Sequence, residues 1–300
     1  MKSSERLTNM TSYQYSITTA KQLIYKYMKL NDIKSKYYSY HSFFDYYVKE
    51  LNILVMEHNL DTNFSGLSVI DKDNRSSISY HKNHCITRQN FTKCHELGHF
   101  LLDHEGTIFT ENNENTIQEH EANCFASFVL APDIVLLYKI VYENQSFKSI
   151  LNDLEISKDC LEIRLFHLLK DYTNLNNKKI ENLIIQFQQN KNRDINLFLY
   201  DIKDSIIFEY QNINPSNFDK SLHLLSKIHY VSSIEIEELV TIELQNKLKL
   251  YNSNLNITSY FDFGKTVFYV WDTRYLDSNQ VLKKVKAELF NYHFFKTKIS

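Results

Sequence analysis

Two histidines and a glutamate that could act on one metal ion lie together at residues 95–99, in the sequence His-Glu-Leu-Gly-His. Side chains four residues apart share one face of a helix, so His95 and His99 can bind the same ion. Glu96 follows the first of them and can reach a water molecule on that ion. A zinc ion bound by two imidazoles activates water, and a neighbouring carboxylate serves as the general base. The predicted chemistry is therefore hydrolysis by a zinc-activated water.

A second helix downstream offers the third ligand. Residues Ile117–Ala131 have helical apolar spacing, and Pro132 ends that helix. Glu119 and Glu121 are the acidic candidates, but they lie about 200° apart around a helix, so only one of them can face the ion. Asn123 lies one turn beyond Glu119 and could hydrogen-bond the outer nitrogen of a ligand histidine.

Short strands are expected before the first of these helices. Residues 66–70 and 76–81 have the composition of strands, and residues 71–75 between them form a polar turn. The strand at 76–81 could align an extended substrate by pairing with its backbone.

The helix that carries the two histidines is expected to run from Asn90 or Phe91 to about Leu102. Gly98 lies between the histidines. Because glycine costs about 1 kcal/mol of helix propensity relative to alanine, we expect a packing or access reason for it. The polar run from Asp103 through Asn115 is expected to be a loop.

The two segments together resemble a known family. Residues 88–102 are similar to the R-x-x-F-T-x-x-HELGH-x-LL signature of ImmA/IrrE-type metallopeptidases, and residues 119–132 are similar to that family's E-x-E-A-N-x-F-A…P helix. The resemblance covers about residues 61–170. It implies an α+β, zincin-like core, in which a small sheet accompanies the active-site helices. Carried over by position, it implies the gluzincin-like zinc ligands His95, His99 and Glu119, with Glu96 as the catalytic base.

One position departs from the family pattern. Many members have a further histidine four residues after the second ligand, where this chain has Asp103, with His104 one residue later. We therefore assign no role to His104. Glu121 is expected to be a solvated surface carboxylate and His120 a surface imidazole. Three residues could stabilise the oxyanion of a tetrahedral intermediate, and their spacing does not choose among them: Tyr80, His81 and His120.

Composition limits the fold and the cellular setting. The chain has 300 residues, of which 43% are hydrophobic, a net charge of −2, 4 Gly and 2 Pro. These values favour a core built from long regular elements and give no strongly basic surface for nucleic acid. The first 25 residues hold no apolar signal region, and no stretch approaches 18 apolar residues, so neither secretion nor membrane insertion is expected. The four cysteines lack C-x-x-C spacing, which is typical of reduced thiols in a cytoplasmic protein.

Four regions are expected along the chain. Residues 1–60 form a helical segment that packs on the catalytic core, residues 61–135 form that core, and residues 136–173 form a helix-turn-helix-like tail. Residues 174–300 form an α+β region for substrate or partner recognition, in which residues 257–272 are expected to make a hairpin.

The helix-turn-helix-like tail raises the question of DNA binding. Ser157 is the expected N-cap of its second helix, and Leu161 and Leu165 are the expected buried positions. The charges over residues 158–169 are balanced, whereas binding to phosphates requires a clearly positive face. The sequence therefore does not favour nucleic acid as a partner.

These observations predict a cytoplasmic zinc-dependent endopeptidase. The resemblance alone implies its partner, a protein substrate such as a transcriptional repressor or another regulator, cleaved at few sites. One alternative is a non-catalytic metallopeptidase fold that acts as a binding partner in a toxin–antitoxin or mobile-element regulatory system. A second alternative is a DNA-binding regulator. No membrane partner is expected, and the sequence does not specify the oligomeric state.

Overall fold

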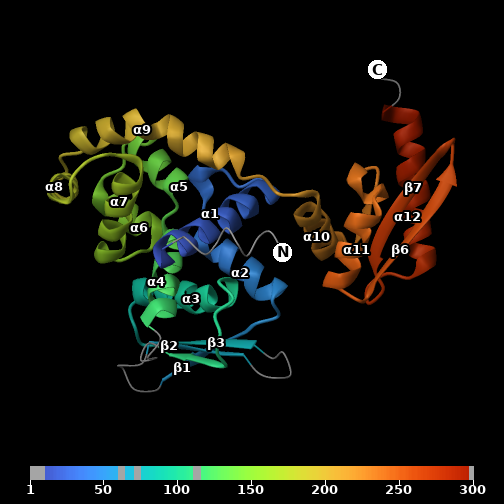
Figure 1. Cartoon of the computed structure of the whole chain (residues 1–300), viewed down its shortest axis with the longest axis horizontal. Helices are drawn as coiled ribbons and strands as arrows, with labels where there is room; N and C mark the ends of the chain where they lie inside the picture. The colour runs from blue at the N-terminus through green and yellow to red at the C-terminus, as the bar shows by residue number, and fades with distance from the viewer. Residues whose placement is uncertain (1–10, 60–64, 71–75, 111–115, 297–300) are drawn as a thin grey trace. The chain divides into compact units, whose positions relative to one another are not determined.

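The chain folds as two units. The computed structural model describes residues 11–59, 65–70, 76–110 and 116–296, and internal contacts divide the chain into Met1–Asn214 and Pro215–Ser300. In the first unit, helices lie over one face of a small sheet (Figure 1). Its helices are α1 (Ser12–Leu30), α2 (Tyr40–Glu50), α3 (Ile86–Leu101), α4 (Thr116–Leu130), α5 (Asp133–Leu137), α6 (Phe147–Leu154), α7 (Lys158–Tyr172), α8 (Asn177–Gln188) and α9 (Arg193–Asn212). Its strands are β1 (Leu54–His58), β2 (Gly66–Ile70), β3 (Ser76–His81) and β4 (Ile108–Thr110).

The sheet of the first unit has the strand order β1–β3–β2–β4. Strand β1 runs parallel to β3, and the other neighbouring strands are antiparallel. Strands β2 and β3 occupy the residues predicted from sequence, which confirms both. The polar turn predicted at 71–75 lies outside the described residues. Because β3 bonds to β1 on one side and to β2 on the other, it has no free edge, and the prediction that it aligns a substrate was wrong.

Two further strands correct the sequence analysis. Strand β1 lies in a segment predicted to be helical, but α2 ends at Glu50, and Asn52 has φ 52°, a left-handed turn that redirects the chain into the strand. Strand β4 lies in the run predicted to be a loop. It is only three residues long, so its sequence alone gives a weak indication of a strand. Its pairing with β2 makes it one.

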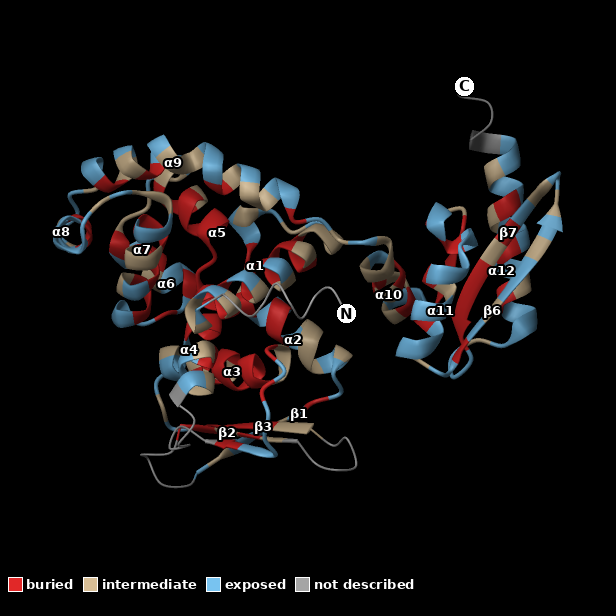
Figure 2. Cartoon of the chain, in the orientation of Figure 1, coloured by how far each residue is buried: buried red, intermediate tan, exposed pale blue. Residues whose placement is uncertain are grey.

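One core joins the helices around α3 and α4. Helix α1 packs along α4, as predicted for the N-terminal segment, and buried residues line the inner sides of these helices (Figure 2). The turn after α6 and the N-cap of α7 also agree with the prediction, because Ser157 accepts a hydrogen bond from the Cys160 amide. Leu161 and Leu165 are fully buried. The helix-turn-helix-like tail is therefore part of this core.

Buried charges connect three helices of the same unit. Asp133 at the start of α5 contacts the guanidinium of Arg164 on α7 and the ammonium of Lys21 on α1. The side chains of Asp133 and Arg164 are each 2% exposed. Desolvation of Arg164 opposes its charge, but the neighbouring groups, with Asp133 first among them, together outweigh that effect and raise the pKa of the guanidinium. The single arginine of α7 is therefore buried in an ion pair inside the fold.

The boundary between the units differs from the one predicted at residue 174. Helices α8 and α9 lie beyond that point, but Ile180, Phe187, Leu199 and Ile206 on them belong to the core of the first unit. The division falls instead at Asn214 and Pro215, between α9 and the next helix. The amphipathic pattern of α8 and α9 is visible in the sequence, but it does not say which core they cover.

The second unit is an α+β layer structure. Its elements are α10 (Asn217–Ile228), β5 (Tyr230–Ser232), α11 (Ile242–Tyr251), β6 (Leu255–Asp262), β7 (Lys265–Asp272) and α12 (Ser278–Asn291). The antiparallel sheet has the order β5–β7–β6, and the predicted hairpin is formed by β6 and β7 around Gly264. Along β7, Val270 faces a core with α10 and α11, whereas Tyr269 and Trp271 face α12. Each unit therefore has its own hydrophobic core.

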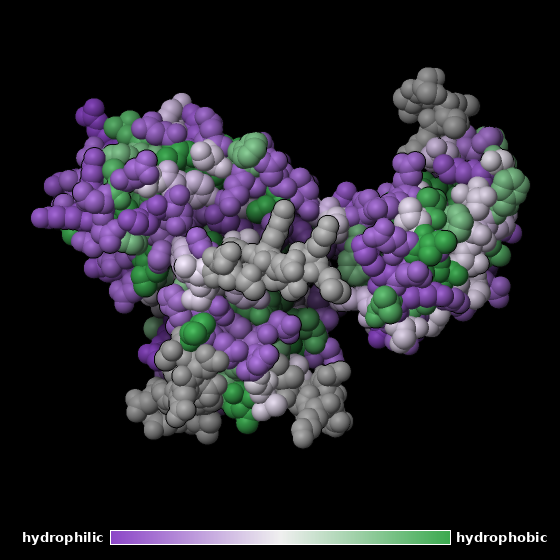
Figure 3. Space-filling view, viewed as in Figure 1, coloured by the Kyte–Doolittle hydropathy of each residue, from purple (hydrophilic) through white to green (hydrophobic). Residues whose placement is uncertain are grey.

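Contrary to the sequence analysis, the stretch Ile117–Tyr142 is long and apolar enough to span a membrane, with a mean hydropathy of 1.9 in its most apolar 18-residue window. Of that window, 89% is buried inside the fold, so core packing accounts for its apolar character. The face seen in Figure 3 is mainly hydrophilic, and hydrophobic residues interrupt it in separate groups. The four cysteines are free, as predicted, and only Cys85 among them is exposed.

Candidate metal centre

Helix α3 presents the two histidines at a buried site. It begins at Ile86, earlier than predicted, because side chains of its first turns are anchored to the preceding segment. Gln89 donates to the backbone carbonyls of Lys82 and His84, and Arg88 donates to the Ser65 hydroxyl at 2.8 Å. These contacts lie outside the helix itself, so local propensity does not reveal them.

His95 and His99 face the same point, as their spacing predicts. Their Nε2 atoms lie 3.1 Å apart, and the residues are 4% and 1% exposed. Glu119 on α4 supplies the third group, with Oε2 3.2 Å from Nε2 of His95 and Oε1 3.6 Å from Nε2 of His99. Glu119, rather than Glu121, thus completes a cluster whose potential ligand atoms all lie within 4.8 Å of one another.

The spacing of these three groups fits a tetrahedral ion. Zinc binds imidazole nitrogen and carboxylate oxygen at about 2.0–2.1 Å, so two ligand atoms of a tetrahedral site lie about 3.3–3.4 Å apart. The separation of 3.1 Å between the two Nε2 atoms is close to that value, and the carboxylate of Glu119 brings Oε2 to 3.2 Å from His95 and Oε1 to 3.6 Å from His99. His95, His99 and Glu119 can therefore hold a metal ion and leave a fourth position for water or substrate.

Gly98 lets α3 and α4 approach closely enough to form the cluster. A Cβ atom at this position would lie 3.1 Å from Cδ1 of Phe125 and 3.5 Å from the backbone of Ala122. Both residues belong to α4, and both are fully buried. The packing reason predicted for this glycine is confirmed.

Each histidine is also held at its outer nitrogen. Nδ1 of His95 lies 3.0 Å from Oδ1 of Asn123, which confirms the predicted contact. Nδ1 of His99 lies 2.9 Å from Nδ1 of His104, and Nε2 of His104 lies 3.1 Å from Oε2 of Glu121. The prediction that Glu121 is a solvated surface carboxylate was therefore wrong, and His104 has a definite place beside the cluster.

The pKa values of the two histidines of the cluster shift in opposite directions. Burial, followed by the neighbouring His95 and His104, lowers the pKa of His99 to about 2, so its imidazole is neutral and offers a lone pair. Burial also disfavours the charged form of His95, but the hydrogen bond with Glu119 and the charges of Glu96 and Glu119 outweigh it and raise the pKa of His95. Without a metal, His95 therefore holds a proton more tightly, and a metal ion must displace it.

Glu96 lies between the histidine helix and the sheet. It is 1% exposed, and its Oε2 accepts a hydrogen bond from the hydroxyl of Ser68 on β2 at 2.6 Å. Strand β2 comes this close because Gly66 has no side chain. A Cβ atom at Gly66 would lie 2.7 Å from Oε1 of Glu96 and 2.3 Å from the methyl group of Thr92. The sheet thus fixes the carboxylate beside the cluster.

Four residues around the cluster have contacts that were not predicted from the sequence. Ser68 and Phe109 lie on strands, and the ring of Phe109 stacks on His99 with the centroids 4.5 Å apart. His104 was assigned no role, and Glu121 was considered only as an alternative third ligand. No spacing rule links these positions to the motif; the only local signal is that β2 is recognisable as a strand.

The three candidates for oxyanion stabilisation make other contacts. The Tyr80 hydroxyl donates to Glu57 at 2.9 Å, and His120, which is exposed as predicted, lies 3.6 Å from the Cys124 sulfur. His81 is buried and stacks on His84. The geometry therefore does not select one of them for this role.

Comparison with known proteins agrees with the site. A search of curated proteins found no match. Residues 48–166 match the family model described as the IrrE N-terminal-like domain, a peptidase family. The match begins before the predicted start of the core, so it includes β1, and it contains the whole candidate cluster. Residues 48–166 therefore form a domain that is similar to the IrrE N-terminal-like peptidase family.

Proposed function

We propose that this protein is a cytoplasmic zinc-dependent endopeptidase that cleaves a regulatory protein, such as a transcriptional repressor. The observation that carries the proposal is the convergence of His95, His99 and Glu119 beside a buried glutamate, Glu96, on the histidine helix. The family match supports a peptidase in general. The choice of zinc rests on the mixed nitrogen and oxygen ligands and on their near-tetrahedral spacing.

Each residue of the candidate site has its own role in the proposed hydrolysis. Zinc, when bound, lowers the pKa of a coordinated water toward about 7 and polarises the scissile carbonyl. Glu96 accepts the proton of the attacking water and returns it to the leaving amine. Ser68 keeps the Glu96 carboxylate oriented through its hydrogen bond. Phe109 covers one face of the His99 ring and keeps solvent from it.

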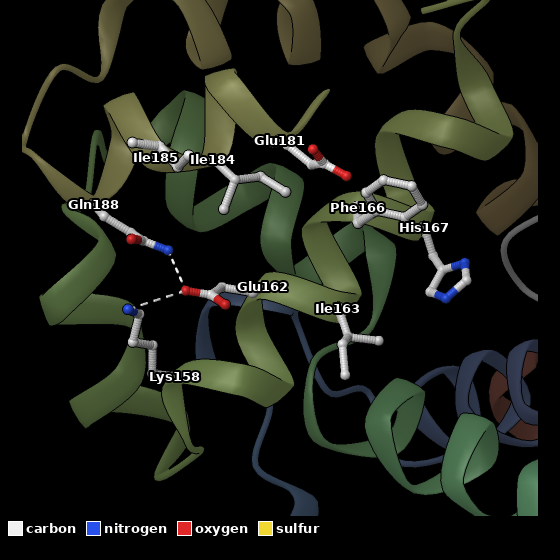
Figure 4. A pocket seen from close by; sticks show the side chains of 9 residues that line it. All are labelled: Lys158, Glu162, Ile163, Phe166, His167, Glu181, Ile184, Ile185 and Gln188. Atoms are coloured by element: carbon white, nitrogen blue, oxygen red, sulfur yellow. Dashed lines mark hydrogen bonds and ion pairs between the residues drawn. The ribbon is translucent and has the colours of Figure 1, made fainter. Parts of the chain in front are cut away.

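The surface of α7 argues against DNA binding through that helix, which is the route that the alternative of a DNA-binding regulator would use. In a helix-turn-helix protein the second helix presents its outer face to DNA. The outer face of α7 instead borders a groove of about 530 Å³ between α7 and α8, and Ile163, Phe166 and Ile185 are among the residues that line it (Figure 4). Lys158 is paired with Glu162. An apolar groove with paired charges lacks the positive potential that phosphate binding needs.

The test compares the wild type with Glu96→Gln, using as substrates the regulators encoded beside the gene. New protein termini are mapped by mass spectrometry, and zinc content is measured by elemental analysis. We expect cleavage by the wild type only, with one zinc per chain in both proteins. His41→Gln is the control, because His41 is exposed and pairs with Glu155 rather than with a residue of the candidate site. Full biological activity of Glu96→Gln would support the non-catalytic binding partner instead.

A further inference from the structure

A line of buried polar contacts leads away from the candidate metal centre on the His99 side. Nδ1 of His99 lies 2.9 Å from Nδ1 of His104, and Nε2 of His104 lies 3.1 Å from Oε2 of Glu121. His104 is 8% exposed, and the side chain of Glu121 is 12% exposed. The three residues come from the end of α3, from the turn after it and from α4.

The backbone holds His104 beneath His99. Asp103 has φ 55°, a left-handed conformation that turns the chain back at the end of α3. The His104 amide then donates to the carbonyl of His99 at 3.1 Å. Phe109 packs against both rings, with centroid distances of 4.5 Å to His99 and 6.5 Å to His104. The orientation of both imidazoles is therefore set by the fold.

The contacts assign the position of each proton. If Nε2 of His99 offers its lone pair to a metal ion, the proton of the neutral ring lies on Nδ1, which donates to Nδ1 of His104. His104 then accepts at Nδ1 and carries its own proton on Nε2, which donates to Glu121. Every donor has an acceptor in this arrangement, so the charge of Glu121 acts on His99 through His104.

We propose that His104 and Glu121 form a positioning relay that keeps His99 in its metal-binding tautomer and strengthens it as a ligand. The relay rests on the proposed zinc site. A carboxylate behind a ligand histidine raises the basicity of the imidazole, and loss of such a partner typically weakens metal binding about 10–100-fold. His95 differs, because the group behind it is the neutral amide of Asn123.

The test uses the full chain and two probes, Zn²⁺ in competition with a chelator and the visible absorption spectrum of the Co²⁺ form. Glu121→Gln keeps the shape of the side chain and removes its charge, and His104→Leu breaks the relay at its centre. We expect each variant to bind Zn²⁺ about 10–100-fold more weakly and to have an altered Co²⁺ spectrum. The double variant should be no weaker than His104→Leu alone, because both substitutions interrupt one path.

His41→Gln is the control, since His41 is exposed and pairs with Glu155 rather than with a residue of the relay. Circular dichroism of the metal-free proteins checks folding; if His104→Leu does not fold, Glu121→Gln still decides the question. Equal Zn²⁺ affinity and an unchanged Co²⁺ spectrum in Glu121→Gln would overturn the relay and leave the peptidase proposal standing. Absence of Zn²⁺ binding by the wild type would overturn both.

Discussion

Ser68 on β2 donates a hydrogen bond to Glu96 on α3, with Oγ and Oε2 2.6 Å apart in the buried interior. Hydrogen bonds to charged groups contribute about 1.5–3 kcal/mol. A general base that is held in one orientation also loses less of its catalytic rate to misalignment. We expect Ser68→Ala to lower kcat about 10-fold, equivalent to about 1.4 kcal/mol, and to leave zinc affinity unchanged.

The control for Ser68→Ala is Ser79→Ala on the neighbouring strand. The Ser79 hydroxyl donates to the Leu67 carbonyl at 3.4 Å rather than to Glu96. Steady-state kinetics on the cleaved regulator compare the two variants. An unchanged kcat in Ser68→Ala, or an equal loss in both variants, would contradict the role given to this hydrogen bond.

Gly98→Ala should destabilise the protein although it improves helix propensity. Alanine gains about 1 kcal/mol in a helix, but overpacking a core costs about 1–3 kcal/mol. The added methyl group would lie 3.1 Å from the ring of Phe125, which is fully buried and has little room to move. Urea unfolding should show a net loss of about 1 kcal/mol in the free energy of unfolding. In a Phe125→Leu background the loss should shrink; a more stable Gly98→Ala would refute the steric argument.

Acid should destabilise the first unit partly through His167. Burial, with the nearby charge of Arg164, lowers the pKa of His167 from 6.5 to about 4. Above pH 6.5 the imidazole is neutral in both the folded and the unfolded state. Between pH 6.5 and 4 only the unfolded state binds the proton, so stability falls as pH falls, and below about pH 4 this contribution stops changing.

The variant His167→Gln isolates that contribution. Urea unfolding in the presence of a chelator should show a pH dependence shallower by about one bound proton between pH 6.5 and 4. His41→Gln is the control, since His41 is exposed and pairs with Glu155 at the surface. An identical slope for the wild type and His167→Gln would show that His167 does not resist protonation in the fold.

The boundary at Asn214 predicts how fragments behave. Residues 1–214 contain the whole core around α3 and α4, so this fragment should unfold cooperatively and bind zinc as tightly as the full chain. The fragment 1–173 lacks α8 and α9, which removes core residues such as Phe187 and Leu199 and exposes the positions they cover. Calorimetry and chelator competition on both fragments test the division. A stable, zinc-binding fragment 1–173 would restore the boundary predicted from sequence.

How much the sequence reveals depends on the range of the interaction. The spacing of His95 and His99 is local, and a helix converts it directly into a shared face. The contact from Asn123 could be predicted because it lies one turn from Glu119. The contacts of Ser68 with Glu96 and of His104 with Glu121 depend on turns and on a sheet register that no local pattern encodes.

Two glycines show what these packing constraints mean for tolerated variation. At Gly264, φ is 72°, and a Cβ atom added there would meet nothing within 4 Å among the described residues. Substitutions at this position should therefore be ranked by how readily each residue adopts a left-handed backbone, with asparagine and aspartate best. At Gly66 the limit is space beside Glu96, so tolerance should fall with side-chain volume whatever the backbone preference, and even alanine should impair cleavage. In a saturation scan, one position would report the shape of a turn and the other would outline the room left for the catalytic carboxylate.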